Sequence, residues 1–267
     1  MSAIKLILLA LVQAATEFLP VSSSGHLLFL KGVLGLEELP LIFDIVLHVG
    51  SLAAIVIFYY KRLRTTVLAA SNELRENYIE KPAVRFIVYA ILATGITFIV
   101  YLFFEAPIEA MTHTPSVLKW TYAITTIILM STFFVKTDRA EPINKKSPLP
   151  AVIVGLFQGL AIVPGISRSG STVSASMLMK IKKDDAAYFS FVLAIPAILG
   201  ALLFKLLDIE QMEFLLQNKL AISLSFVVSL VFSYLFLWIL VWIIQKGKFW
   251  IFAVYTGAMS IVSAILF

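Results

Sequence analysis

The chain has 267 residues, of which 60% are apolar and 14% are charged, and its mean hydropathy is +0.97. A soluble domain usually has about a quarter charged residues, so this composition excludes a water-soluble enzyme, a disordered chain and a nucleic-acid-binding module. Cysteine is absent, which excludes disulfides, thiol nucleophiles and cysteine metal sites. Lys and Arg exceed Asp and Glu, which gives a net charge of +5. In a membrane protein this excess bears on the placement of loops rather than on acidic partners.

The first apolar stretch covers residues 4–19 and stops at Pro20; a polar run over 22–26 and a short apolar piece to Leu36 follow. Because proline lacks an N–H and ends a helix, this pattern predicts a half-helix, a loop and a second half-helix. Neither half reaches the ~20 residues that span a bilayer. We therefore expect a re-entrant hairpin, since irregular backbone at membrane depth must face protein or water.

A signal peptide over residues 1–20 is the alternative for this stretch. Gln13 and Glu17 interrupt its apolar run, and the polar run after it would then have no purpose. We expect these residues to belong to the fold.

The rest of the chain repeats this plan. A second broken stretch covers residues 149–163, stops at Pro164, and continues with a polar run over 165–172 and an apolar piece to Met179. Three segments long enough to span a membrane follow each broken stretch: 41–60, 84–104, 117–135, 186–207, 220–244 and 249–267. The intervening segments 61–83 and 136–148 are expected to be mixed-charge connections.

The two broken stretches align at an offset of 145 residues. The matched pairs are Gln13 with Gln158, Ser22 with Ser167, Ser24 with Ser169 and Gly25 with Gly170. A hairpin returns to its own side and three spans cross to the other, so the second half must enter from the opposite face. This predicts an all-α integral membrane protein with an inverted-topology repeat in one membrane domain, 1–267, with repeats over about 1–140 and 149–267. Chance similarity between two Ser/Gly loops is the alternative, which the matched order of segments disfavours.

The positive-inside rule tests this topology. With 61–83 in the cytoplasm, 15 Lys and Arg residues lie on the cytoplasmic side and 5 on the outer side, and Arg168 at the second tip completes the 21. The split predicts that both termini lie outside and that the first hairpin opens outward.

Glu17 is the first candidate for chemistry, because an ionised carboxylate in an apolar segment is costly unless it is paired or bound to metal. Gln13 lies one turn before it on the same face. A structural Glu17 that only hydrogen-bonds the hairpin loops is the alternative.

Arg168 lies between two serines and before a half-helix. Such a loop offers backbone N–H groups and a helix dipole to an anion, particularly phosphate, and arginine adds a fork of donors that matches phosphate oxygens. The alternative is a salt bridge to Glu17 that holds the two tips together, and the two states could also alternate.

His26 closes the other polar run and can act as base, acid or nucleophile, while a serine beside a base can be a nucleophile. A polar anchor at a helix start is the alternative for His26. Asp44 and His48, one turn apart, could supply a metal ligand or form a plain i,i+4 pair.

These motifs resemble a known family. Three stretches carry the resemblance: Gln13-x-x-x-Glu17-Phe-Leu-Pro-Val-Ser-Ser-Ser-Gly-His26, Pro164-Gly-Ile-Ser-Arg-Ser-Gly-Ser-Thr172 and Phe189–Gly200. They resemble the undecaprenyl pyrophosphate phosphatases of the bacitracin-resistance type. The resemblance implies a plasma-membrane enzyme that depends on a divalent metal and opens to the outside. It would remove the terminal phosphate of a C55 polyprenyl pyrophosphate and so recycle the carrier lipid for peptidoglycan. Oxygen ligands such as Glu17 suit Mg²⁺ or Ca²⁺.

By position, the resemblance implies roles for Gln13, Glu17, Ser23, His26 and Arg168, and the residue types of the two polar runs and of Asp44 add the other expected site residues. Catalytic residues would be Glu17, Ser23, His26 and Arg168; substrate-binding residues would be Gln13, Ser22, Ser24, Ser167, Ser169 and Thr172; metal ligands would be Glu17 and Asp44. Many relatives have glutamate at the positions of Gln13 and Asp44 and glutamine at that of His48, so this chain has one carboxylate fewer for a metal.

We expect the lipid pyrophosphate and membrane lipids as partners, no nucleic acid, and allow for a homodimer. The nucleophile stays open among Ser23, His26 and water. The rival function is a flippase for a polyprenyl phosphate lipid, because inverted repeats with broken hairpins are also a transporter plan.

Overall fold

The computed structural model describes residues 3–35, 39–75, 81–112, 114–135, 140–205 and 209–267. Regular structure in these ranges is helical, apart from one isolated bridge between Glu141 and Ile181. The α-helices are α1 (Ala3–Phe18), α2 (Ser23–Leu34), α3 (Leu41–Arg75), α4 (Pro82–Thr112), α5 (Leu118–Ser131), α6 (Leu149–Leu160), α7 (Arg168–Leu178), α8 (Lys183–Lys205), α9 (Ile209–Gln217), α10 (Lys219–Gln245) and α11 (Phe252–Leu266). Short 3₁₀ turns cover Pro115–Val117, Thr132–Phe134, Ile143–Lys145 and Phe249–Ile251. The predicted all-α class is confirmed.

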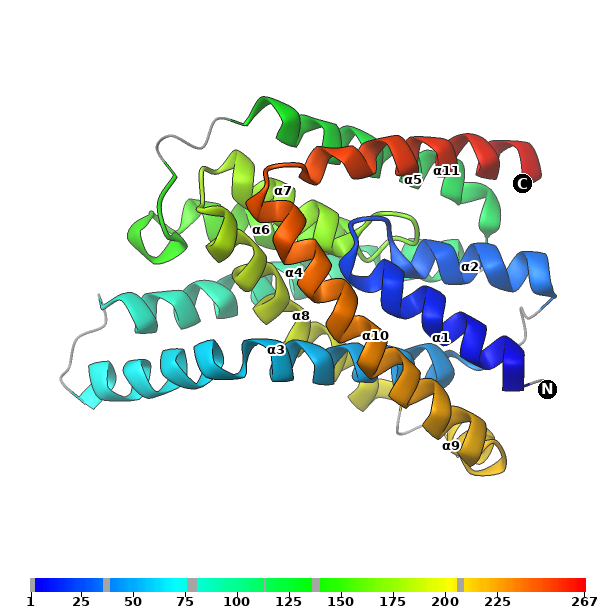
Figure 1. Cartoon of the computed structure of the whole chain (residues 1–267). Coiled ribbons are helices and arrows are strands. Elements are labelled where there is room, and N and C mark those ends of the chain that lie inside the picture. Colours follow the sequence, from blue (N-terminus) through cyan, green and yellow to red (C-terminus); the bar gives the residue numbers. More distant parts are fainter. Residues whose placement is uncertain (1–2, 36–38, 76–80, 113, 136–139, 206–208) are drawn as a thin grey trace.

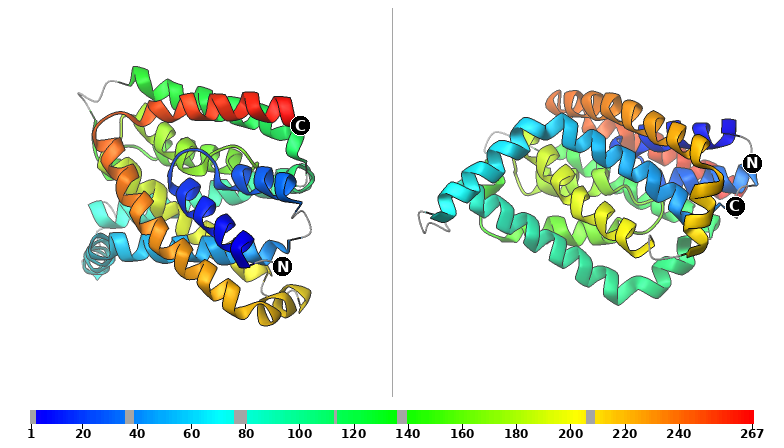
Figure 2. Two further views of the ribbon diagram at one scale, coloured as in Figure 1. Left: turned by 45° about the vertical axis from the view of Figure 1, so that its right-hand side comes forward. Right: turned by 90° about the horizontal axis from the view of Figure 1, so that it is seen from below.

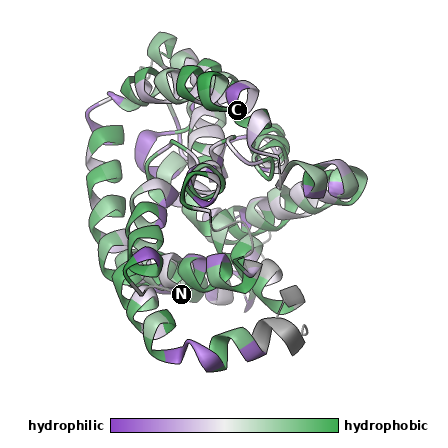
Figure 3. Ribbon diagram, turned by 90° about the vertical axis from the view of Figure 1, so that its right-hand side faces the viewer, coloured by the Kyte–Doolittle hydropathy of each residue, from purple (hydrophilic) through white to green (hydrophobic). Residues whose placement is uncertain are grey.

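Among the described residues, five helices are long and apolar enough to cross a membrane. They are Ile42–Arg75, Pro82–Thr112, Pro115–Phe134, Lys219–Gln245 and Phe249–Leu266. The protein is therefore a multi-pass membrane protein, and apolar colour dominates its outer helices (Figure 3). These five coincide with predicted spans; the sixth prediction, 186–207, falls on α8, which is not among the five and whose continuation over 206–207 lies outside the described residues.

The predicted connection over 61–83 is wrong in its first part, because α3 continues as helix to Arg75. At 1.5 Å per residue its 35 residues reach about 52 Å, beyond a ~30 Å hydrocarbon core. The charged residues of the predicted connection thus extend the same helix past the apolar layer. Glu73 on this extension accepts the N–H groups of Ala83 and Val84 at 3.0 and 2.9 Å, which caps the start of α4.

Some residues used in the predictions above lie outside the described residues. These are Leu36 at the end of the first hairpin, and Lys136 and Arg139 in the charge count. The side chain of Lys205, also counted, is likewise outside it.

The two broken stretches form two helical hairpins, α1–α2 and α6–α7, broken where Pro20 and Pro164 lie. The second halves begin earlier than the polar runs suggested, because Ser22 and Ser167 cap them. Their Oγ atoms accept the N–H groups of Gly25 at 3.3 Å and Gly170 at 3.1 Å. Most of both polar runs therefore lies in first helical turns.

The helices pack in matching pairs. Helix α1 lies against α10 while α6 lies against α4, and α3 packs on α8 as α5 packs on α11. The element order is hairpin and three long helices, twice, with the unpredicted α9 inserted in the second half. Figures 1 and 2 place the N- and C-terminal ends at one end of the molecule, and the last turns of α3 with the first turns of α4 at the other, the α3–α4 end.

The tips of the two hairpins, residues 19–22 and 161–167, are in contact. The Gly165 N–H donates to Ser22 Oγ at 3.1 Å, and Thr125 on α5 donates to the Gly165 carbonyl at 2.8 Å. Gly165 has φ +92°, and a Cβ there would lie 2.0 Å from Thr121 Oγ1. The contact therefore requires glycine at this position.

We expect Gly165→Ala to destabilise the protein by about 3 kcal/mol, because the new methyl group clashes with Thr121 and the left-handed backbone becomes strained. Thermal unfolding in detergent measures the effect. Gly95→Ala on α4 is the control, since a Cβ there meets nothing within 4 Å; equal melting temperatures for the two variants would contradict the tip contact.

Candidate active site

Glu17, near the end of α1, is the centre of a buried polar cluster. Its side chain is 4% exposed. Its Oε1 pairs with Arg168 Nη2 from the second hairpin. Its Oε2 accepts the Ser23 hydroxyl at 2.6 Å and lies 3.1 Å from His48 Nε2 on α3, with the Gln13 amide at 3.4 Å. Four helices thus place donors and cations on one carboxylate, which offsets the cost of burying its charge.

Arg168, the first residue of α7, has one nitrogen left over. The predicted salt bridge to Glu17 is present through Nη2. Nη1 is buried and has no hydrogen-bond partner among the described residues. A buried guanidinium donor without an acceptor is costly, and phosphate oxygens accept paired N–H groups from one guanidinium. The arrangement therefore suits an anion bound beside the existing bridge.

Two helices begin at this point, α2 at Ser23 and α7 at Arg168. The free N–H groups and the positive dipole end of each helix favour negative charge there. Ser23, Ser24, Arg168 and His48 are only partly buried, so these side chains face the accessible side of the cluster.

His26 on α2 lies beside Ser23 in sequence, but its ring is engaged elsewhere. Nδ1 lies 2.8 Å from the Ser22 carbonyl and 3.0 Å from Tyr122 Oη, and Nε2 lies 2.7 Å from Tyr255 Oη. Sequence reasoning missed both tyrosines, because they come from α5 and α11 and no local motif marks them.

Gln13 is fully buried one turn before Glu17. Its Nε2 donates to Ser51 Oγ at 3.0 Å and its Oε1 accepts from Ser229 Oγ at 3.0 Å, while Ser51 contacts Ser233 at 2.7 Å. Sequence reasoning missed these serines, although Ser225, Ser229 and Ser233 recur every fourth residue of α10, a spacing typical of one helix face. The network thus ties Gln13 on α1 to α3 and α10.

The remaining predicted substrate-binding residues line the two tips. Ser24 Oγ lies 3.3 Å from Ser22 Oγ, and Ser169 Oγ lies 3.4 Å from Ser167 Oγ. Thr172 Oγ1 donates to the Arg168 carbonyl at 2.8 Å. Of the predicted motif residues, Gln13, Ser23 and Arg168 thus contact the Glu17 carboxylate, and the remaining ones contact other groups in and beside the two tips.

Asp44, the second predicted metal ligand, pairs through Oδ2 with Lys31 Nζ at 2.6 Å. Its Oδ1 is buried and has no partner among the described residues. His48, one turn on, donates from Nδ1 to the Asp44 carbonyl at 2.6 Å and reaches Glu17 from its other nitrogen. The described residues contain no group of three or more His, Cys, Asp or Glu that could hold a metal ion. The buried Oδ1 of Asp44, which lacks a partner among the described residues, is an oxygen of the kind that Mg²⁺ and Ca²⁺ bind.

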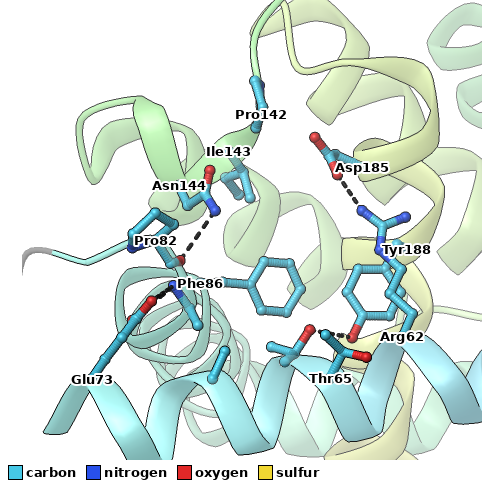
Figure 4. Close-up of a pocket in the computed structure, with 13 residues that line it drawn as sticks. Arg62, Thr65, Glu73, Pro82, Phe86, Pro142, Ile143, Asn144, Asp185 and Tyr188 are labelled. Carbon is cyan, nitrogen blue, oxygen red and sulfur yellow. Dashed lines mark hydrogen bonds and ion pairs between the residues drawn. The ribbon is translucent and has the colours of Figure 1, made fainter.

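A separate pocket of about 260 Å³ lies between α3, α4 and α8 near the α3–α4 end (Figure 4). Arg62, Asp185 and Tyr188 line it, and no predicted site residue does. A chain of aromatic ring contacts runs from this pocket to the residue after Glu17: Phe86, Tyr188, Tyr59, Phe191 and Phe18, with centroids 5.1 to 6.2 Å apart. These rings fill the interior between the pocket and the Glu17 cluster.

Known proteins similar to this chain over nearly its whole length share one name. A relative from Alkaliphilus metalliredigens is 36% identical, with complete coverage of both chains. Relatives from Methanobrevibacter smithii and Carboxydothermus hydrogenoformans are each 34% identical, over 98% and 100% of this chain and 96% and 98% of their own lengths. All three carry the name undecaprenyl-diphosphatase. A family model described as bacitracin resistance protein BacA matches residues 6–262, and the chain belongs to this family.

Proposed function

We propose that this protein hydrolyses undecaprenyl pyrophosphate to undecaprenyl phosphate and inorganic phosphate, and so recycles a carrier lipid. The observation that carries the proposal is the arrangement at Glu17, where the Ser23 hydroxyl and a guanidinium with one unpartnered nitrogen meet on one carboxylate. Family membership and the names of the relatives support hydrolysis. They do not support the flippase alternative.

The site would take the terminal phosphate between the two tips. Arg168 would bind it through Nη1, and the N-termini of α2 and α7 would add positive potential. The polyprenyl tail would stay in lipid, because the outer helices are apolar. Charge on the transferring phosphoryl group would thus be stabilised by groups already in place.

The geometry favours Ser23 as the nucleophile, because its hydroxyl already donates to Glu17 at 2.6 Å whereas both ring nitrogens of His26 are engaged. Ser23 Oγ would attack the terminal phosphorus while Glu17 takes the hydroxyl proton and the bridging P–O bond breaks. Undecaprenyl phosphate leaves. Water then attacks the phosphoserine, the proton returns from Glu17 to Ser23 Oγ, and inorganic phosphate is released.

A divalent cation, when bound, would act as a Lewis acid on phosphate oxygens. We propose Glu17 and Asp44 as its protein ligands, Asp44 through the unpartnered Oδ1. Two carboxylates with substrate oxygens are a usual environment for Mg²⁺.

We also propose the inverted-topology repeat, with re-entrant hairpins, as the architecture that holds this site. Its support is the matched packing of α1 on α10 and α6 on α4, together with the contact between the tips. We propose that the α3–α4 end lies in the cytoplasm, and the bias of Lys and Arg toward it supports this orientation. The site would open on the outer side of the plasma membrane, with both termini outside. A homodimer stays a prediction.

We expect Ser23→Ala to lower kcat for phosphate release by a factor on the order of 10³, because the nucleophile is lost. Brief reaction with a ³²P-labelled substrate, followed by acid quench, should label the wild type and not the variant. Ser71→Ala on the exposed end of α3 is the control. Retained labelling in Ser23→Ala would exclude Ser23 as the nucleophile.

We expect Arg168→Lys to lower kcat/KM by about 10²-fold, because an ammonium keeps the charge but loses the planar fork. Steady-state kinetics with detergent-solubilised lipid measures this loss. The matched control is Arg62→Lys in the pocket of Figure 4, which should keep its activity. Similar losses in both variants would point to general instability rather than to phosphate binding.

Removal of divalent metal with a chelator should abolish phosphate release, and Mg²⁺ or Ca²⁺ should restore it. Asp44→Asn should raise the metal concentration needed for half-maximal activity by about tenfold, since one ligand charge is lost. Metal titration of the two proteins measures this shift. Full activity in excess chelator would refute the metal dependence.

A further inference from the structure

Two helices, α5 and α11, meet the ring of His26 on α2, and their tyrosines lie outside the motifs that carry the proposed reaction. His26 is 6% exposed. The ring of Tyr255, on α11, stacks on it with 9° between the planes, and the ring of Tyr122, on α5, meets it edge-on at 82°. Each phenol oxygen lies within hydrogen-bond distance of one imidazole nitrogen.

The contacts decide which nitrogen carries the proton. The Ser22 carbonyl, 2.8 Å from Nδ1, can only accept, so Nδ1 must donate. A neutral imidazole has one N–H, and a charged one would be costly here because no carboxylate of the described residues is hydrogen-bonded to the ring. Nε2 is therefore an acceptor, and Tyr255 donates to it at 2.7 Å. Tyr122 faces a nitrogen whose proton is already engaged.

The bond to Ser22 matters because this residue is strained and central. Ser22 has φ +69°, a conformation that costs a non-glycine residue free energy. Its Oγ accepts N–H groups from Gly165 and Gly25 and so joins the two tips. Ser23, with its hydroxyl on Glu17, follows directly. A ring that holds the Ser22 carbonyl therefore also sets the backbone that aims Ser23.

We propose that Tyr255 is a positioning residue that acts through His26. The Tyr255 hydroxyl holds Nε2, keeps the Nδ1–H on the Ser22 carbonyl, and so keeps Ser23 aligned for attack. The effect on turnover rests on the proposed phosphatase function; the proton position on His26 does not.

Tyr255→Phe removes only the hydroxyl and should lower kcat for phosphate release by about tenfold with little change in KM, because the loss concerns alignment rather than binding. Tyr122→Phe is the matched variant on the other nitrogen and should stay within about twofold of the wild type, since Nδ1 already donates to Ser22. Tyr234→Phe, on the exposed face of α10, controls for loss of a tyrosine hydroxyl elsewhere. A loss in Tyr122→Phe as large as in Tyr255→Phe would overturn the assignment.

A double-variant test separates positioning from a general structural effect. An asparagine amide can take the place of Nδ1–H but cannot reach Tyr255. His26→Asn should therefore keep more activity than His26→Gln, and adding Tyr255→Phe to His26→Asn should cost nothing further. Additive losses would show that Tyr255 does not act through His26.

The third measurement needs no activity. ¹⁵N NMR of histidine-labelled protein in detergent reports which ring nitrogen is protonated, and the chain has only 3 histidines, so one variant assigns His26. The wild type should show the Nδ1–H form, and Tyr255→Phe should lose it in part to the Nε2–H form. An Nε2–H or doubly protonated wild type would overturn the proposal. Absence of phosphate release with the Nδ1–H form present would instead refute the proposed function alone.

Discussion

An ionised carboxylate inside an apolar helix bundle is tolerated only while cations and hydrogen-bond donors surround it, and Glu17 meets this condition with partners from three other elements. Arg168 comes from the second hairpin, His48 from α3 and Ser23 from α2. Loss of any one of the cations would leave buried charge uncompensated, at a cost of about 3 to 5 kcal/mol. The same carboxylate therefore joins the two hairpins and accepts the hydroxyl of Ser23.

The ion pair between Glu17 and Arg168 depends on the close approach of the two hairpin tips. Arg168 reaches Glu17 because the Gly165 backbone lies against Gly25, where a Cβ would come within 2.8 Å of the Gly165 Cα. The Ser22 hydroxyl spans the contact, because it accepts an N–H group from each of the two hairpins. In the proposed reaction the phosphate binds Arg168 through Nη1 while Nη2 stays on Glu17, so one guanidinium joins the ion pair between the hairpins to the bound substrate.

Much of this arrangement could be predicted from local chemistry. Pro20 and Pro164 interrupt their helical runs where polar residues follow, whereas Pro107 and Pro196 lie inside α4 and α8. Proline together with a polar run therefore made both hairpins predictable, as was their order with the long helices. Glu17 and Arg168 stand out because charge is expensive in apolar segments, and a bridge between them was one of the predicted alternatives. The end of α3 was predicted wrongly, because charged residues mark the edge of the apolar layer but do not by themselves end a helix.

The sequence by itself determined the helical class, the position of the breaks and the residue types of the two tips, since these depend on proline, on hydropathy and on near neighbours in the chain. Only the tertiary structure decided which side chains support the tips. Tyr255 contacts His26 across 229 positions and Ser229 contacts Gln13 across 216. Such pairs arise from packing between distant helices, and no local pattern in a single sequence records which faces will meet.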